Sequence, residues 1–172
     1  MTVQRTAEDI AKRAVALCIV AMYADDLRRN SSIRKSRMFI SVVCESFSAT
    51  EFFSPSEHTF IINDNPDSAT IVSFVWMYEC LNALMFALGY TDSLGELDNF
   101  CDIDRCITVI NEKRNFEAFL EGAEPRDLEE IAAAAADYER FRENGEGNPN
   151  IVSARLRALN WLIGSEETEE VW

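Results

Sequence analysis

The sequence predicts an all-α protein: a single globular domain of six or seven helices packed around a central buried helix at about residues 68–89. Three observations predict this fold class. Apolar residues recur at helical spacing in most of the chain. Helix-start signals such as Ser54-Pro55-Ser56-Glu57 are frequent. No strand–turn–strand pattern is present. At 172 residues the chain is expected to form one domain, over residues 1–164, with a frayed acidic tail at 165–172.

The expected central helix rests on residues 69–90, ATIVSFVWMYECLNALMFALGY, which only Thr70, Ser73, Glu79 and Asn82 interrupt with polar groups. A helix that is apolar on every side either spans a membrane or lies in a globular core. The run is long enough to cross a bilayer core of about 30 Å. An acidic residue at its middle, however, costs about 2.5–3.5 kcal/mol on insertion scales, and no basic cluster flanks the run. We therefore predict a buried core helix and no membrane span.

The ends of this helix are also indicated. Asp67 or Ser68 is a suitable N-cap, and Gly89 stands where a left-handed C-terminal residue is usual.

The remaining helices follow from caps and periodicity. Residues 38–53 are ambiguous, because Phe39-Ile40-Ser41-Val42-Val43 is locally β-rich, and a second helix is preferred there over a strand. In chain order we expect helices at residues 6 to about 29, 38–53, 54–62, 102–113, a short one at 116–120, one that starts at Pro125, and 151–163.

Charge is unevenly distributed. Residues 1–50 carry 8 Lys+Arg and 5 Asp+Glu, a net of +3, whereas residues 51–172 carry 8 and 25, a net of -17, which gives -14 for the chain. Such a field repels nucleic acid and anionic lipid. It favours either solubility alone or a basic protein partner, so nucleic acid is not an expected ligand.

Five cysteines at odd spacing, at 18, 44, 80, 101 and 106, suit buried free thiols in a reducing compartment better than a disulfide framework. With no secretory signal, the expected location is the cytoplasm. With one histidine, His58, no set of four zinc ligands is available. A nucleophilic Cys101 beside His58 would need a third orienting group that the sequence does not name. No metal and no cofactor is expected.

The most informative polar feature is Glu79 with Asn82, which share one face of the central helix. A buried carboxylate must be paired or protonated. Arg155 or Arg157 on the last helix, or Arg13 on the first, can supply the partner. The structural interpretation is a buried ion pair that fixes helix register, and it is preferred to the functional one, an acid/base carboxylate in a pocket.

One basic cluster is present, at residues 28–37. Its functional interpretation is an anion patch and its structural one a solvated helix end. The residues of the possible patch are Arg28, Arg29, Arg34, Lys35 and Arg37.

Two segments resemble a known family. Residues 74–90 (FVWMYECLNALMFALGY) are similar to its WRxEALxxLLWALGY element, and residues 155–164 (RLRALNWLIG) to its ERxxALNWLxG element, with weaker similarity at 14–23, 45–57 and 101–104. This is the bacterial family of domains of unknown function numbered 4272. The resemblance implies a helical, intracellular bacterial protein and brings no activity, substrate or catalytic residue.

The chain departs from this pattern. Met77 stands where Arg is usual and Ala154 where Glu is usual, which suggests a thinned polar network. Asn82 and Phe86 stand at positions that are often aromatic. Glu79 and Arg155 remain, and we expect them to meet. The predicted buried network comprises Glu79, Asn82, Arg155, Asn160 and Trp161.

Two functions compete at this stage. The leading hypothesis is a non-catalytic interaction or accessory protein whose acidic body masks a basic partner, as small immunity proteins do. The alternative is an enzyme or small-molecule-binding protein with a pocket around Glu79, Asn82 and Arg155. A closed, filled region around Glu79 favours the first, and a solvent-connected cavity of several hundred Å³ favours the second. The sequence does not indicate an oligomeric state.

Overall fold

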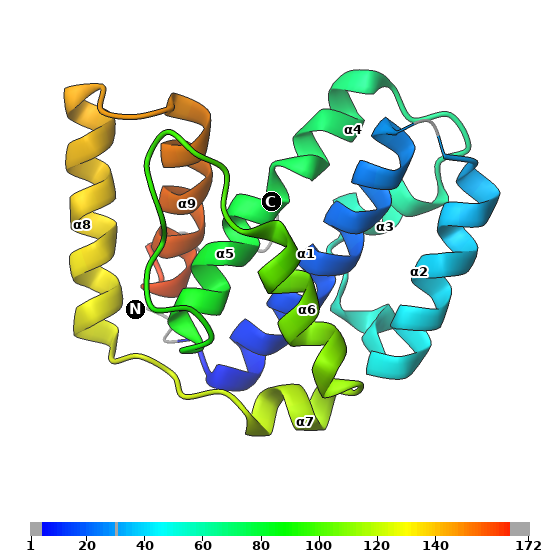
Figure 1. The fold of residues 1–172 in the computed structure, drawn as a ribbon, viewed down its shortest axis with the longest axis horizontal. Helices are drawn as coiled ribbons and strands as arrows, with labels where there is room; N and C mark the ends of the chain where they lie inside the picture. Colours follow the sequence, from blue (N-terminus) through cyan, green and yellow to red (C-terminus); the bar gives the residue numbers. More distant parts are fainter. Residues whose placement is uncertain (1–4, 30, 166–172) are drawn as a thin grey trace.

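Helix α1 (Ala7–Arg28) runs through the middle of the protein, and α5 (Met77–Ala87) packs against it (Figure 1). The computed structural model describes residues 5–29 and 31–165. The other elements are α2 (Ile33–Phe47), a 3₁₀ helix (Ala49–Phe52), α3 (Pro55–Ile62), α4 (Ser68–Val75), α6 (Ile103–Lys113), α7 (Phe116–Glu121), α8 (Leu128–Asn144) and α9 (Pro149–Leu162). The all-α prediction is confirmed, and the number of helices is close to the six or seven expected.

The hydrophobic run is buried in its second half only. Every residue of α5 is buried, so this helix lies in the core as predicted. The run is broken at Trp76, however, and α4 buries only Phe74. The expectation of one continuous buried helix over 68–89 is therefore wrong for its first turns. By length and composition Ser68–Ala87 passes as a membrane span, but 61% of its most apolar window is buried inside the protein.

Helices α1 and α5 share the centre of the fold, because most residues of α1 are buried as well. It contacts α2 and α3 on one side, α4 and α5 on another, and α6 and α7 below. In Figure 1, α8 and α9 form a pair on the left, and α2 lies at the right edge beyond α1. The first helix expected from the sequence, at residues 6 to about 29, is thus a second core helix.

Several helix starts agree with the sequence. Thr6 and Asp9 form a capping box at α1, and Ser54 and Glu57 form another at α3. Asp67 caps α4 through Thr70 N. Each cap satisfies backbone N–H groups that a helix start leaves unpaired.

The turn after α5 needs a glycine. Gly89 has a φ of +78°, and a Cβ there would lie 2.2 Å from the carbonyl oxygen of Glu124. The N–H of Tyr90 donates back to the carbonyl of Met85 at 2.9 Å, which closes the end of the helix.

Two predicted starts were wrong. The second helix begins at Ile33 and not at 38, so much of the basic cluster is helical. The preference for a helix over a strand in this segment is correct. The helix expected from Pro125 begins at Leu128. The N–H groups of Glu124 and Arg126 instead donate to the carbonyls of Leu88 and Ala87, each at 2.9 Å, so this segment pairs with the end of α5.

The domain bounds of 1–164 stay a prediction, and residues 166–172 of the predicted tail lie outside the described residues.

Candidate functional site

A buried ion pair joins the two segments that carry the sequence pattern. Arg155 on α9 donates from Nε to Oε2 of Glu79 on α5 at 2.7 Å, and neither side chain is exposed. The other carboxylate oxygen, Oε1, accepts the backbone N–H of Cys101 at 2.7 Å. The structure thus brings Glu79 and Arg155 together and adds a third partner, the loop between α5 and α6.

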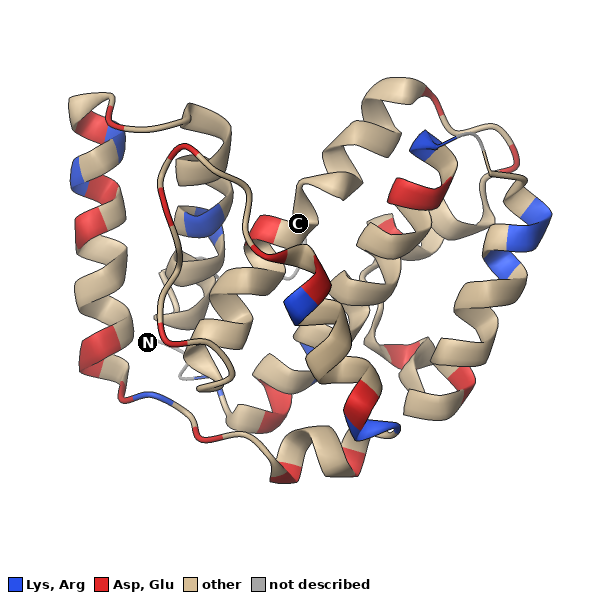
Figure 2. Ribbon diagram, in the orientation of Figure 1, with Lys and Arg blue, Asp and Glu red and all other residues tan. Residues whose placement is uncertain are grey.

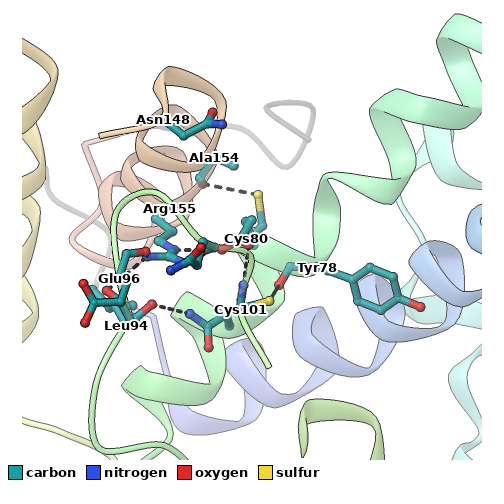
Figure 3. Close-up of polar contacts among 12 residues, drawn as sticks. Tyr78, Cys80, Leu94, Glu96, Cys101, Asn148, Ala154 and Arg155 are labelled. Atoms are coloured by element: carbon teal, nitrogen blue, oxygen red, sulfur yellow. Dashed lines mark hydrogen bonds and ion pairs between the residues drawn. The ribbon is translucent and has the colours of Figure 1, made fainter. Parts of the chain in front are cut away.

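The side chain of Arg155 donates hydrogen bonds to main-chain carbonyls of this loop (Figure 3). Nη1 donates to the carbonyls of Gly95 and Glu96, at 3.3 and 2.9 Å, and Nη2 to that of Asn99 at 3.2 Å. Nη1 also reaches the hydroxyl of Tyr138 on α8, at 3.0 Å. One guanidinium therefore connects α5, α8, α9 and the loop that covers them.

A second arginine holds the start of the same loop. Arg126 donates from Nη2 to the carbonyl of Thr91 and from Nε to that of Phe86, each at 2.9 Å. Its guanidinium also lies over the Phe86 ring, 4.2 Å from the centroid. Both ends of the loop are thus fixed to the helices by charge-assisted hydrogen bonds.

The ion pair is closed and fully hydrogen-bonded, as the structural interpretation expects. Burial alone would lower the pKa of Arg155, but the hydrogen bond to Tyr138 and the charge of Glu79 outweigh it and raise that pKa. Both carboxylate oxygens and all three guanidinium nitrogens have partners. Neither residue lines any of the cavities described below. A filled, closed region is what the structural interpretation requires.

The other predicted members of the network are separated from the ion pair. Asn82 lies one turn further along α5 and donates from Nδ2 to the carbonyl of Leu94 at 2.9 Å. Trp161 is buried under Arg5, whose guanidinium is 4.5 Å from the ring centroid. Asn160 is half-buried, and its backbone carbonyl accepts the hydroxyl of Ser165 at 2.9 Å. The grouping of Asn160 and Trp161 with Glu79 stays a prediction.

A second buried ion pair was missed. Arg13 on α1 pairs from Nη2 with Glu57 on α3, with 4% and 0% of the side chains exposed, and its Nη1 donates to the carbonyl of Phe52 at 3.2 Å. Arg13 had been a candidate partner for Glu79. The sequence signal for Glu57 was its capping-box position, which is correct, since its Oε2 accepts the N–H of Ser54 at 2.8 Å.

The basic cluster does not converge on one site. Arg28 and Arg29, at the end of α1, both pair with Asp25, at 2.7 and 2.8 Å. On α2, Arg37 pairs with Asp64 at 2.7 Å, and Arg34 and Lys35 are exposed. Figure 2 shows these basic residues divided between the end of α1 and the first turns of α2.

Three of the surface hollows lie near residues singled out by the sequence. A groove of about 640 Å³ runs beside α4 and the loop before α6, lined by Asp25, Arg28, Arg29, Val72, Val75, Trp76, Phe100, Cys101, Asp102, Ile103 and Asp104. A smaller pocket of about 280 Å³ lies on the other side of Phe100 and includes Asn82 and Thr91. A cleft of about 630 Å³ separates α2 from α3 and contains His58 and Cys44.

A stacked aromatic pair, with one exposed ring and one half-buried ring, lines the groove. Phe100 is 51% exposed and stacks on Trp76, with ring centroids 4.8 Å apart. Trp76 is the residue at which the hydrophobic run breaks. Val72, on the exposed side of α4, extends the apolar surface.

The thiols are protonated at neutral pH. Burial raises the pKa of Cys18 and of Cys80 to about 12 and that of Cys106 to about 11, and it also raises that of Cys101. Only the thiolate is a nucleophile. Cys101 lies against α5 while His58 lines the α2–α3 cleft, so the two do not form a catalytic pair. Within residues 5–29 and 31–165, no group of three or more His, Cys, Asp or Glu is placed to hold a metal.

These observations define the class: a helical protein whose polar core is structural and whose open features are surface hollows. Residues 2–172 match the family model DUF4272, described as a domain of unknown function, and the chain belongs to this family. The comparisons with curated proteins and with solved structures found no match.

Proposed function

We propose that this protein is a non-catalytic interaction protein of the bacterial cytoplasm that binds a basic segment of a partner protein. The observation that carries the proposal is the groove beside the stacked Trp76–Phe100 pair, of which Phe100 is exposed and Trp76 half-buried. The groove shares Cys101 with the Glu79–Arg155 network, but the side chains of Glu79 and Arg155 do not line it.

The groove has the chemistry that such a segment needs. Aromatic side chains are enriched at the centres of protein interfaces, and their faces attract cations. Three carboxylates line the groove, from Asp25, Asp102 and Asp104. The two arginines there are paired with Asp25, at 2.7 and 2.8 Å, and Asp104 is exposed, so a cation from outside can reach its carboxylate.

The charge of the whole chain acts in the same direction. A net charge of -14 attracts a basic partner and speeds its encounter. Long-range attraction is not specific, so the groove must supply the specificity through contact. This distinction sets the design of the test.

The test measures binding of a fluorescent amphipathic Lys/Leu peptide by anisotropy at 150 mM salt, with a Glu/Leu peptide as the negative control. Phe100→Ser should weaken binding by about tenfold, the effect of losing one aromatic anchor, and Asp104→Asn by a smaller factor. Both side chains are exposed, so the fold should tolerate the changes.

Matched controls lie on α8, away from the groove. Leu128→Ser removes an exposed apolar side chain and Glu143→Gln an exposed charge, and both should leave the Kd unchanged. Equal weakening by the groove variants and their controls would show that only the overall field attracts the peptide, and it would reject the proposal.

A further inference from the structure

The small pocket beyond Phe100 has polar groups that the fold does not use. It has a volume of about 280 Å³ and is lined by Asn82, Thr91, Asp92, Ser93, Leu94, Gly95, Phe100, Cys101, Asp102 and Arg105. Asn82 and Thr91 are 5% and 7% exposed, so both are more than nine-tenths buried. The pocket lies under the loop that Arg126 and Arg155 fix in place, so its shape is preformed.

Thr91 presents an unused hydroxyl. Its Oγ1 is buried and has no hydrogen-bond partner among the described residues, although its backbone carbonyl accepts from Arg126 at 2.9 Å. A buried polar atom without a partner costs free energy that a ligand can recover. The position is therefore suited to a bound hydrogen-bonding group.

The lining consists mainly of acceptors. Because Leu94 offers a carbonyl, Asn82 must direct Nδ2 to it, and this leaves Oδ1 as an acceptor for the pocket. Asp92 and Asp102 add two carboxylates, and Arg105 is the single basic residue of the lining. The net charge of these three side chains is -1, so the pocket favours a donor that carries positive charge.

We propose that this pocket binds a primary ammonium group, that of a lysine in the basic segment which the groove receives. The inference rests on the proposed function, because the groove and the pocket share Phe100, Cys101 and Asp102. A segment that lies over Phe100 can thus extend one side chain into the pocket. The three hydrogens of an ammonium match Thr91 Oγ1, Asn82 Oδ1 and one carboxylate.

The size of the pocket supports a single side chain. Pockets for drug-sized ligands are about 300–1,000 Å³, and this one is just below that range. A flexible alkyl stem that ends in a compact charge fits such a space and can pack against Leu94 and Phe100.

The first test uses a small probe, n-butylammonium chloride, titrated into the ¹⁵N-labelled protein and followed by NMR. We expect saturable shifts at Ser93, Gly95 and the side-chain amide of Asn82. Butyltrimethylammonium has the same charge but no N–H group, and it should not produce them. Equal shifts with both probes, or no saturable shift, would overturn the pocket assignment.

Thr91 supplies a variant that spares the fold. Thr91→Val keeps the shape and the backbone carbonyl, and it removes only a hydroxyl that has no partner. It should weaken n-butylammonium binding by about three- to tenfold, the effect of one hydrogen bond, while Thr91→Ser retains binding. Unchanged affinity in Thr91→Val would also overturn the proposal.

The Lys/Leu peptide separates the two proposals. If Phe100→Ser weakens peptide binding and Thr91→Val does not, the groove stands and the lysine pocket fails. If n-butylammonium binds but Phe100→Ser leaves the affinity for the peptide unchanged, the proposed function fails. The assignment of the ammonium group to a lysine of a bound segment then fails as well.

Discussion

The two buried arginine–carboxylate pairs differ in how much of the chain each one holds. Arg13 connects α1 to the side chain of Glu57 and to the carbonyl of Phe52. Arg155 connects Glu79, the hydroxyl of Tyr138 and three carbonyls of an irregular loop. The first pair joins α1 to α3 and to the 3₁₀ helix, whereas the second joins three helices to an irregular loop. Burial of the two pairs is nearly equal, so burial alone does not reveal this difference.

The largest effect is expected from Arg155→Met. It leaves the Glu79 carboxylate buried without its cation. It also removes the hydrogen-bond donor of the loop carbonyls of Glu96 and Asn99. Loss of one partner of a buried pair costs about 3–5 kcal/mol, and the upper end of that range is expected in urea unfolding. Arg157→Met, on the same helix, is the control and should cost far less.

Arg13→Met should cost about 3 kcal/mol, at the lower end of the same range. The Glu57 carboxylate keeps the N–H of Ser54 as a partner, and the carbonyl of Phe52 loses a donor. If Arg155→Met and Arg13→Met lower the free energy of unfolding by the same amount within error, the proposed difference between the two pairs is contradicted.

Arg155→Lys sharpens the comparison by keeping the charge and removing the planar set of donors. Lysine can pair with Glu79 but cannot also span the carbonyls of Gly95 and Asn99. We expect a loss of about 2 kcal/mol and faster amide hydrogen exchange confined to residues 91–102. Uniform acceleration across all helices would argue against a local role.

Alkaline pH should affect the Glu79 side of the core. The folded pKa of Cys80 is raised by burial to about 12, from an ordinary value of 9.0. Its stabilising contribution is therefore complete below pH 9 and is lost as pH rises toward 12, at about 1.4 kcal/mol per pH unit. Urea unfolding at pH 8 and 10 checks this, and Cys80→Ala should reduce the slope.

The smallest effect is expected from Arg37→Gln. Its partner Asp64 has a side chain that is 87% exposed, and exposed pairs contribute less than about 1 kcal/mol. A loss as large as that of Arg13→Met would mean that the bond from Arg37 to the carbonyl of Ile61, at 2.8 Å, matters more than the ion pair.

The sequence predicted the Glu79–Arg155 contact because a lone carboxylate in an apolar run needs a cation. It did not reveal Glu57, since the capping box already accounted for that residue. It also gave no sign of the loop carbonyls that Arg155 binds. Main-chain acceptors are the same at every position, so the sequence does not mark which of them a side chain will reach.

The break at Trp76 and the exposed side of α4 were also unpredicted. No proline or glycine interrupts residues 69–88, and apolar composition alone cannot separate a core helix from a half-exposed one. The unpaired hydroxyl of Thr91 depends on tertiary packing and has no sequence signature.

The arginine that grips the loop before α6 has a consequence for divergence within the family. Arg155 binds Gly95, Glu96 and Asn99 through their main-chain oxygens. Its contacts with the loop therefore do not depend on which side chains stand at these positions. Substitutions at 96 and 99 can then alter what the surface displays while the scaffold beneath is preserved. We expect relatives to keep the arginine and its carboxylate partner and to vary the surface residues of the loop that the arginine binds.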